Sequence, residues 1–191
     1  MAVPVTPLTF EVTFHGPVRV GRGRAGIGVD DTVDPDVIVP GSSLKGLMRA
    51  EASVLLGGRG AGLVDEVFGT ARQPSPWHWG DIRASGSADD EVRSGARIRV
   101  DSTAGTAVDG GLFSTEYRWP RTAGFSLQRF TALTDADCER HELVLWAAAL
   151  SVHSIGADRN RGFGWVDIRR VGPEPDDAFV ARVAQLMGVR S

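Results

Sequence analysis

Residues 8–14 read Leu-Thr-Phe-Glu-Val-Thr-Phe, an alternation of apolar and polar side chains. A period of two places the apolar side chains on one face, which predicts a strand buried on one side. After a stretch rich in glycine and charge, apolar residues recur at helical spacing from Leu44 to Leu55, and Gly57-Gly58 ends the predicted helix. The chain therefore opens with a strand followed by a helix.

The remaining pattern adds strands and one more long helix. Strands are predicted over 77–84, 96–101, 125–133 and 165–171, with a helix over 137–154. The order strand, helix, strands, helix, strand is the ferredoxin-like α+β arrangement, an antiparallel sheet with helices on one face. RNA-recognition domains share it and leave the other sheet face open for bases.

The composition restricts the function classes. The 191 residues include 20 arginines, a single lysine and 24 acidic residues, for a net charge of −3. This charge excludes a globally basic nucleic-acid binder but leaves room for a local basic groove. The single cysteine, Cys138, excludes an internal disulfide and favours a reducing, cytoplasmic setting. The longest apolar run, 143–150, is too short to span a membrane.

Pro40-Gly-Ser-Ser-Leu-Lys-Gly46 precedes the first helix. Ser42 or Ser43 can cap that helix, and free N–H groups at a helix start attract phosphate. Lys45 and Arg49 lie one turn apart on the same face. The motif therefore indicates an anion site, and the alternative is a capped surface helix with two solvated cations.

Two loops carry further chemistry. The glycine-rich loop 156–164 contains Arg159 and Arg161, which are bidentate phosphate donors; the alternative is an ordinary connection between a helix and a strand. The acidic run between Asp30 and Asp36 can hold Mg²⁺ or take a proton from a hydroxyl. The alternative for that run is a solvated surface.

Together these motifs resemble the RAMP superfamily of CRISPR proteins. Pro40 to Gly46 with Arg49 resembles the family's PGSSLKG signature, and residues 17–21 resemble its N-terminal P-x-x-x-G element. Residues 99–113 resemble the block D-x-x-T-G-T-A…G-x-L-F, and residues 159–164 resemble the C-terminal glycine-rich loop. The four blocks occur in the family's order, and the resemblance is greatest to the repeating backbone subunit of type III effector complexes.

That resemblance implies a modified RNA-recognition fold over residues 1–171, with an acidic loop at 21–39, a β-hairpin thumb at 102–124 and a helical tail at 172–191. CRISPR RNA, target RNA, other type III effector subunits and copies of the chain in a helical filament are the implied partners. The implied guide-RNA contacts are Ser42, Ser43, Lys45, Arg49, Arg159 and Arg161. Phe113, Tyr117 and Trp119 supply stacking or wedge surface in the thumb.

The resemblance also implies ribonuclease chemistry. Asp30 matches the family's RNA-cutting aspartate, and Asp31 is the neighbour that can take its place. A divalent metal, Mg²⁺ by preference and bound by Asp30, would neutralise phosphate charge during attack by the 2′-hydroxyl. The expected products are a 2′,3′-cyclic phosphate and a 5′-hydroxyl.

Three alternatives stay open at this point. The first is a backbone subunit that binds and spaces guide RNA without cutting, because the binding motifs are shared. The second is a guide-processing nuclease of the same superfamily that uses a histidine, for which His15 and His78 are the candidates. The third is a domain unrelated to RNA.

Overall fold

The computed structural model describes residues 6–84 and 90–188 of the chain. The strands are β1 (Leu8–Phe14), β2 (Val37–Val39), β3 (Trp77–Trp79), β4 (Ile82–Arg83), β5 (Val92–Val100), β6 (Ala107–Arg118), β7 (Thr122–Arg129) and β8 (Val166–Arg170). The α-helices are α1 (Gly41–Leu56), α2 (Ala61–Phe68), α3 (Asp135–Ser151) and α4 (Asp177–Met187), with short 3-10 helices at Gly58–Gly60 and Arg159–Arg161. The ends of the expected domain and tail, residues 1–5 and 189–191, lie outside the described residues.

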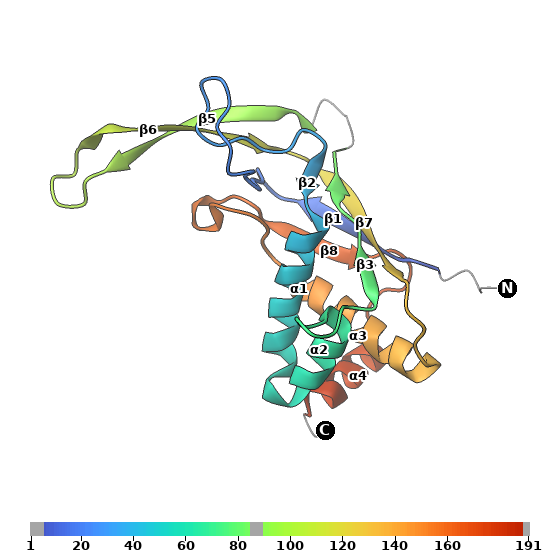
Figure 1. Cartoon of the computed structure of the whole chain (residues 1–191). Helices are drawn as coiled ribbons and strands as arrows, with labels where there is room; N and C mark the ends of the chain where they lie inside the picture. The colour runs from blue at the N-terminus through green and yellow to red at the C-terminus, as the bar shows by residue number, and fades with distance from the viewer. Residues whose placement is uncertain (1–5, 85–89, 189–191) are drawn as a thin grey trace.

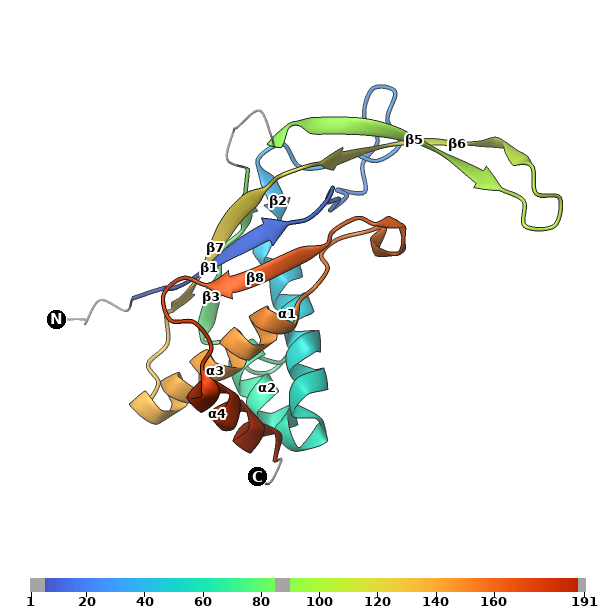
Figure 2. The same cartoon turned by 180° about the vertical axis from the view of Figure 1, so that it is seen from behind.

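Four strands form the central sheet in the order β3-β7-β1-β8, and every neighbouring pair is antiparallel. Helices α1 and α2 connect β1 to β3, and α3 connects β7 to β8. The helices α1, α2, α3 and α4 lie on one face of this sheet (Figures 1 and 2). The predicted ferredoxin-like α+β fold is confirmed.

The core lies between this sheet and the helices. Strand β1 alternates as predicted, because Leu8, Phe10, Val12 and Phe14 are buried. The rings of Phe10 and Phe125 on β7 stack with centroids 5.0 Å apart. The apolar stripe of α1 is buried against this layer, and the same stripe contacts α3.

Several predicted boundaries are wrong. The strand expected over 77–84 is divided at Gly80 into β3 and β4, and β4 pairs with β2 instead of joining the main sheet. The thumb expected at 102–124 is a longer hairpin that starts earlier, with β5 paired to β6 from Val92↔Arg118 to Val100↔Ala107. This hairpin projects from the body of the molecule (Figures 1 and 2).

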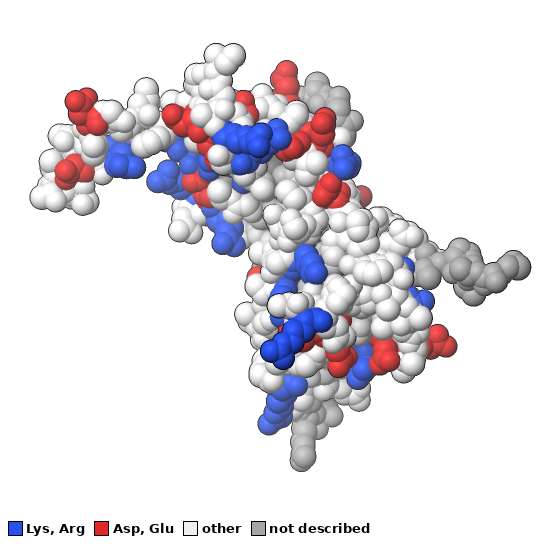
Figure 3. All heavy atoms as spheres, viewed as in Figure 1, with Lys and Arg blue, Asp and Glu red and all other residues white. Residues whose placement is uncertain are grey.

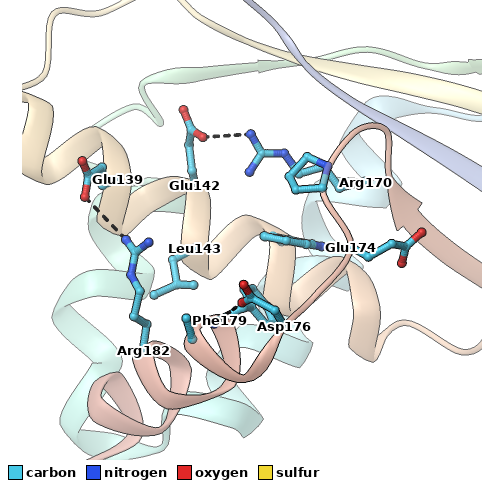
Figure 4. A pocket seen from close by; sticks show the side chains of 11 residues that line it. Glu139, Glu142, Leu143, Arg170, Glu174, Asp176, Phe179 and Arg182 are labelled. Atoms are coloured by element: carbon cyan, nitrogen blue, oxygen red, sulfur yellow. Dashed lines mark hydrogen bonds and ion pairs between the residues drawn. The ribbon is translucent and has the colours of Figure 1, made fainter.

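The C-terminal helix α4 packs on its own chain. The ring of Phe179 lies 4.2 Å from that of Trp146 on α3, measured between centroids. The ion pair Arg182–Glu139, at 3.5 Å, joins the same two helices across a small pocket (Figure 4). Within residues 6–84 and 90–188 no helix is long and apolar enough to cross a membrane.

Candidate nucleic-acid interface

The acidic segment that begins at Asp30 lies against the edge of β6. The Asp30 amide donates to the Ser114 carbonyl at 2.8 Å, and the Glu116 amide donates to the Asp31 carbonyl at 3.0 Å. Asp31 and Thr115 form a parallel bridge. The segment expected as an acidic loop over 21–39 is therefore held partly to the hairpin by backbone hydrogen bonds, because the exposed edge of β6 offers backbone partners.

Asp30 and Asp31 have different surroundings. The Asp30 side chain is exposed, and its Oδ2 accepts the Ser114 amide at 2.7 Å. Within the described chain, no hydrogen bond reaches its Oδ1. Asp31 is partly buried, forms an ion pair with Arg19 and accepts the Gly23 amide at 3.1 Å. Asp30 therefore has a carboxylate oxygen available to a ligand, and the Asp31 carboxylate is engaged within the fold.

Both aspartates line a hollow of about 560 Å³ at the foot of the hairpin. Its lining is Arg19, Asp30, Asp31, Arg97, Ile98, Arg99, Phe113, Thr115 and Arg161. Four arginines against two aspartates make the hollow locally positive in a chain whose net charge is −3. Basic side chains gather where the hairpin leaves the body (Figure 3). The hollow therefore has the charge that a phosphate requires, with an open carboxylate beside it.

The glycine-rich loop closes one side of this region. Phe163 of the loop lies under the Arg97 guanidinium, 5.3 Å from ring centroid to Cζ, and edge-on to Tyr117 at 5.6 Å between ring centroids. Arg159 and Arg161 are exposed. Tyr117 therefore joins the loop to the hairpin, which the sequence analysis did not anticipate.

The other two thumb aromatics differ from Tyr117. Phe113 lies under the Arg99 guanidinium, 5.2 Å from centroid to Cζ, and is partly buried. Trp119, beyond the end of β6, is 45% exposed. These two rings therefore offer surface to a ligand.

The start of α1 is not capped by Ser42 or Ser43. The helix begins at Gly41 with Pro40 as its N-cap residue, and both serines lie exposed in the first turn. The Gly41 amide donates to Oδ1 of Asp81 at 2.9 Å. One helix-terminal N–H group is thus satisfied by a carboxylate of the protein, because the chain reversal after β3 brings Asp81 there.

Lys45 and Arg49 diverge in the structure. Arg49 donates to the Gly69 carbonyl and to the Asp65 carboxylate, each at 2.5 Å, and so connects α1 to α2. Lys45 is partly exposed and has no acidic partner among the described residues. It lines a wide groove of about 870 Å³. Phe130, 65% exposed, lines the same groove and was missed by the sequence analysis.

The open face of the sheet lacks the stacking surface of RNA-recognition domains. The aromatic residues of its four strands, Phe10, Phe14, Trp77, Trp79 and Phe125, are all buried. The alternate positions of these strands are small, polar or charged. The expectation that this face is open to bases therefore has no support in its side chains.

The donors in the hollow fit a divalent ion only in part. Mg²⁺ is commonly bound by one or two carboxylates together with substrate phosphates and water. In the described part of the chain, no group of three or more His, Cys, Asp or Glu residues is arranged to hold a metal. Oδ1 of Asp30 therefore fits as one carboxylate ligand, and an ion there needs its other ligands from a phosphate and water.

Three residues at this site were not identified from the sequence. Arg19, Arg97 and Asp158 come from segments far apart in the chain and form ion pairs with one another. Arg19 and Asp158 both lie within segments that carried motifs, but nothing in one sequence indicates that they meet. Their contact depends on the closure of the sheet.

The comparisons with known proteins agree with this fold. A model of the RAMP superfamily matches residues 11–167. A chain of the type III-B Cmr-beta bound to cognate target RNA superimposes with a TM-score of 0.63 at 11% identity, covering 87% of this chain and 97% of that one. A chain of the apo Cmr-beta gives 0.59 at 13%, with 86% and 97% covered. No curated protein matches.

Proposed function

Because the chain belongs to the RAMP superfamily, we propose that it is a backbone subunit of a type III CRISPR ribonucleoprotein that binds guide RNA and cuts complementary target RNA. The structural neighbours come from type III-B Cmr-beta, in one case bound to cognate target RNA, and this supports RNA as the ligand. Such a subunit has other type III proteins and copies of itself as neighbours in a helical filament.

The observation behind the cutting activity is the hollow at the foot of the hairpin. It combines the exposed Asp30 carboxylate with the guanidinium groups of Arg99 and Arg161. Neither arginine has an acidic partner among the described residues. A carboxylate serves as general base, and guanidinium groups bind and neutralise a phosphate.

The proposed reaction is an in-line transfer at a target nucleotide displaced by the hairpin. Asp30 Oδ1 accepts the proton of the 2′-hydroxyl as its oxygen attacks the adjacent phosphorus. The bond from phosphorus to the 5′-oxygen breaks, and the departing oxygen takes a proton from solvent water. The products are a 2′,3′-cyclic phosphate and a 5′-hydroxyl. Arg99 and Arg161 offset the charge that develops on the phosphate.

The proposal includes a divalent ion, most of whose ligands would come from the RNA. It would supply Lewis-acid stabilisation of the phosphate, and the Asp30 carboxylate would hold it through an oxygen lone pair that does not take the proton. The guide strand is bound elsewhere on the subunit, by Lys45 at α1 and by Arg159 at the glycine-rich loop. Sequence specificity then comes from guide pairing.

Asp30→Asn in an assembled complex tests the cutting proposal. We expect target cutting to fall at least about 100-fold, because general-base catalysis is lost, with guide binding unchanged. Asp36→Asn is the matched control, since Asp36 is exposed on the same acidic segment, and it should cut normally. Regularly spaced cutting at the wild-type rate by Asp30→Asn would show that another group is the base, and no cutting by the wild-type complex would identify a non-catalytic spacer.

A guide-processing nuclease is the second candidate, and one observation favours it. His78 lines the same groove as Lys45, so a histidine lies near a phosphate-binding cation. His15 is instead bonded to Asp167 at 2.8 Å. Site-specific cleavage of CRISPR repeat RNA by the chain alone, lost in His78→Gln, would select this function over the first.

A further inference from the structure

Four charged side chains form a continuous series beside the hollow, which we call the charge series: Arg97, Asp158, Arg19 and Asp31. Oδ1 of Asp158 lies 2.6 Å from a guanidinium nitrogen of Arg97. Its Oδ2 lies 3.0 Å from Arg19, whose other terminal nitrogen contacts Asp31. The series joins the hairpin, the glycine-rich loop, the segment after β1 and the acidic segment.

Backbone contacts strengthen the link between the glycine-rich loop and the segment after β1. The Ala157 amide donates to the Arg19 carbonyl at 2.8 Å, and the Gly164 amide donates to the Pro17 carbonyl at 2.7 Å. A Cβ on Gly156 would lie 2.4 Å from the Arg19 carbonyl oxygen, so only glycine permits this approach. A shift of the loop therefore displaces Arg19 as well.

Asp158 is held in a specific conformation. It is the one non-glycine residue with positive φ in the described chain, at 62°, a region that Asp and Asn tolerate better than other residues. Burial acts to raise the pKa of Asp158, but the hydrogen bonds and charges of Arg97 and Arg19 outweigh it and lower the pKa overall. The carboxylate is therefore ionised and its two oxygens hold different arginines.

The ion pairs of the charge series are shielded from water. The side chains of Arg19, Asp158 and Arg97 are 13%, 16% and 21% exposed. Partly desolvated pairs of this kind respond strongly to the loss of one partner, because the other charge stays buried and unpaired. Nε of Arg19 is also buried and has no hydrogen-bond partner among the described residues, so the residue has little to compensate a lost carboxylate.

We propose that Asp158 is a positioning residue that couples RNA binding at the glycine-rich loop to the placement of the Asp30 carboxylate. The inference rests on the proposed function, since it takes Asp30 as the cutting residue. A guide phosphate on Arg159 fixes the loop, Asp158 fixes Arg19, and Arg19 fixes Asp31, which is joined to Asp30 by one peptide bond. Guide occupancy thereby orders the cutting site.

Asp158→Asn is the sharpest test, because asparagine keeps the size and tolerates the positive φ while removing the charge. In an assembled complex we expect guide and target binding near the wild-type level and a maximal cutting rate lower by about tenfold, the cost of a displaced catalytic group. Glu142→Gln is the matched control: it removes a carboxylate that is paired with Arg170 at 3.1 Å and does not line the hollow. It should cut normally.

Hydrogen exchange on the chain alone gives a readout that does not depend on cutting. In the wild type, guide RNA should slow amide exchange over residues 22–34, and in Asp158→Asn this protection should be lost. Arg19→Lys, which keeps the charge but lacks the two terminal nitrogens that separately reach Asp158 and Asp31, should behave like Asp158→Asn. The double variant should be no worse than either single variant.

The outcomes separate this inference from the proposed function. Normal cutting by Asp30→Asn would refute the proposed role of Asp30. The hydrogen-exchange measurement would still decide whether Asp158 couples the glycine-rich loop to the acidic segment. If Asp30→Asn is inactive while Asp158→Asn cuts at the wild-type rate with full protection of residues 22–34, the coupling is refuted alone. Equal losses of rate in Asp158→Asn and Glu142→Gln would also refute it, since they would reflect stability in general.

Discussion

Lys45 and Arg49 lie one turn apart on α1, and their side chains have different partners. The Arg49 guanidinium is bound by Asp65 and the Gly69 carbonyl, whereas the Lys45 ammonium has no acidic partner among residues 6–84 and 90–188. Asp30 and Asp31 differ in the same way, since Arg19 forms an ion pair with Asp31 and not with Asp30. At this scale, availability to RNA depends on which group already has an internal partner.

The first prediction at this scale concerns RNA affinity. Lys45→Ala should weaken binding of single-stranded RNA by about tenfold, the effect of losing one charged hydrogen bond to phosphate. Arg49→Ala should lower the free energy of unfolding by about 1 kcal/mol and change RNA affinity less, because its partly exposed ion pair and carbonyl contact are internal. RNA titration and urea unfolding of both variants measure these effects. A larger loss of affinity in Arg49→Ala than in Lys45→Ala would contradict this assignment.

At the scale of elements, the helices and strands are connected by a few polar contacts through the core. His141 on α3 is 3% exposed, and its Nδ1 accepts from Trp77 Nε1 on β3 at 3.2 Å. Burial lowers the pKa of His141, with a partly opposing effect of Glu66. The folded state therefore holds this histidine neutral, and protonation at Nδ1 would remove the contact between α3 and β3.

This contact predicts a dependence of stability on pH. Because the folded pKa lies below the unfolded value of about 6.5, the unfolded state binds more protons in acid, and stability falls as the pH is lowered below that value. His141→Gln, which keeps an acceptor for Trp77 but does not titrate, should flatten this decline. Urea unfolding at a series of pH values from neutral to mildly acidic measures it. A decline of the same size in wild type and variant would assign it to other groups.

At the scale of the whole molecule, charge is separated in space. The net charge is −3, yet basic side chains gather at the foot of the hairpin and on the side that α1 occupies (Figure 3). Several acidic groups are engaged by arginines, as in the pairs of Asp31, Asp65 and Asp158. The positive charge available to RNA therefore depends on the unpaired cations and not on the net charge of the chain.

The salt dependence of RNA binding tests whether these unpaired cations contact phosphates. If Lys45, Arg159 and Arg161 each contact one phosphate, the logarithm of the binding constant for single-stranded RNA should fall with the logarithm of salt with a slope of about −2. Each alanine substitution among the three should reduce the slope by about 0.7. Arg182→Ala is the control on α4, where the arginine is paired with Glu139. A slope near zero would argue against phosphate binding by these residues.

The periodic elements could be predicted from the sequence because their signal is local. The alternation over 8–14 and the stripe after Leu44 each depend on neighbours in the chain, and both elements lie where predicted. The start of the hairpin could not be predicted, since β5 is mostly exposed and its first residues, 92–95, lack an alternating pattern. The helix cap was missed because its carboxylate, Asp81, is 40 residues away from Gly41.

The sequence by itself determined the order of the main-sheet strands and of the helices α1 and α3, the blocks that resemble the RAMP superfamily and the set of candidate residues. The tertiary structure alone decided which candidates are free: it engaged Arg49, Tyr117 and Asp31 internally and left Lys45 and Asp30 open. It also assembled the charge series, in which Arg19 and Asp158 are 139 residues apart. Sequence periodicity indicates whether a residue is buried or exposed on its own strand or helix. An ion pair between distant segments forms only when the sheet brings those segments together.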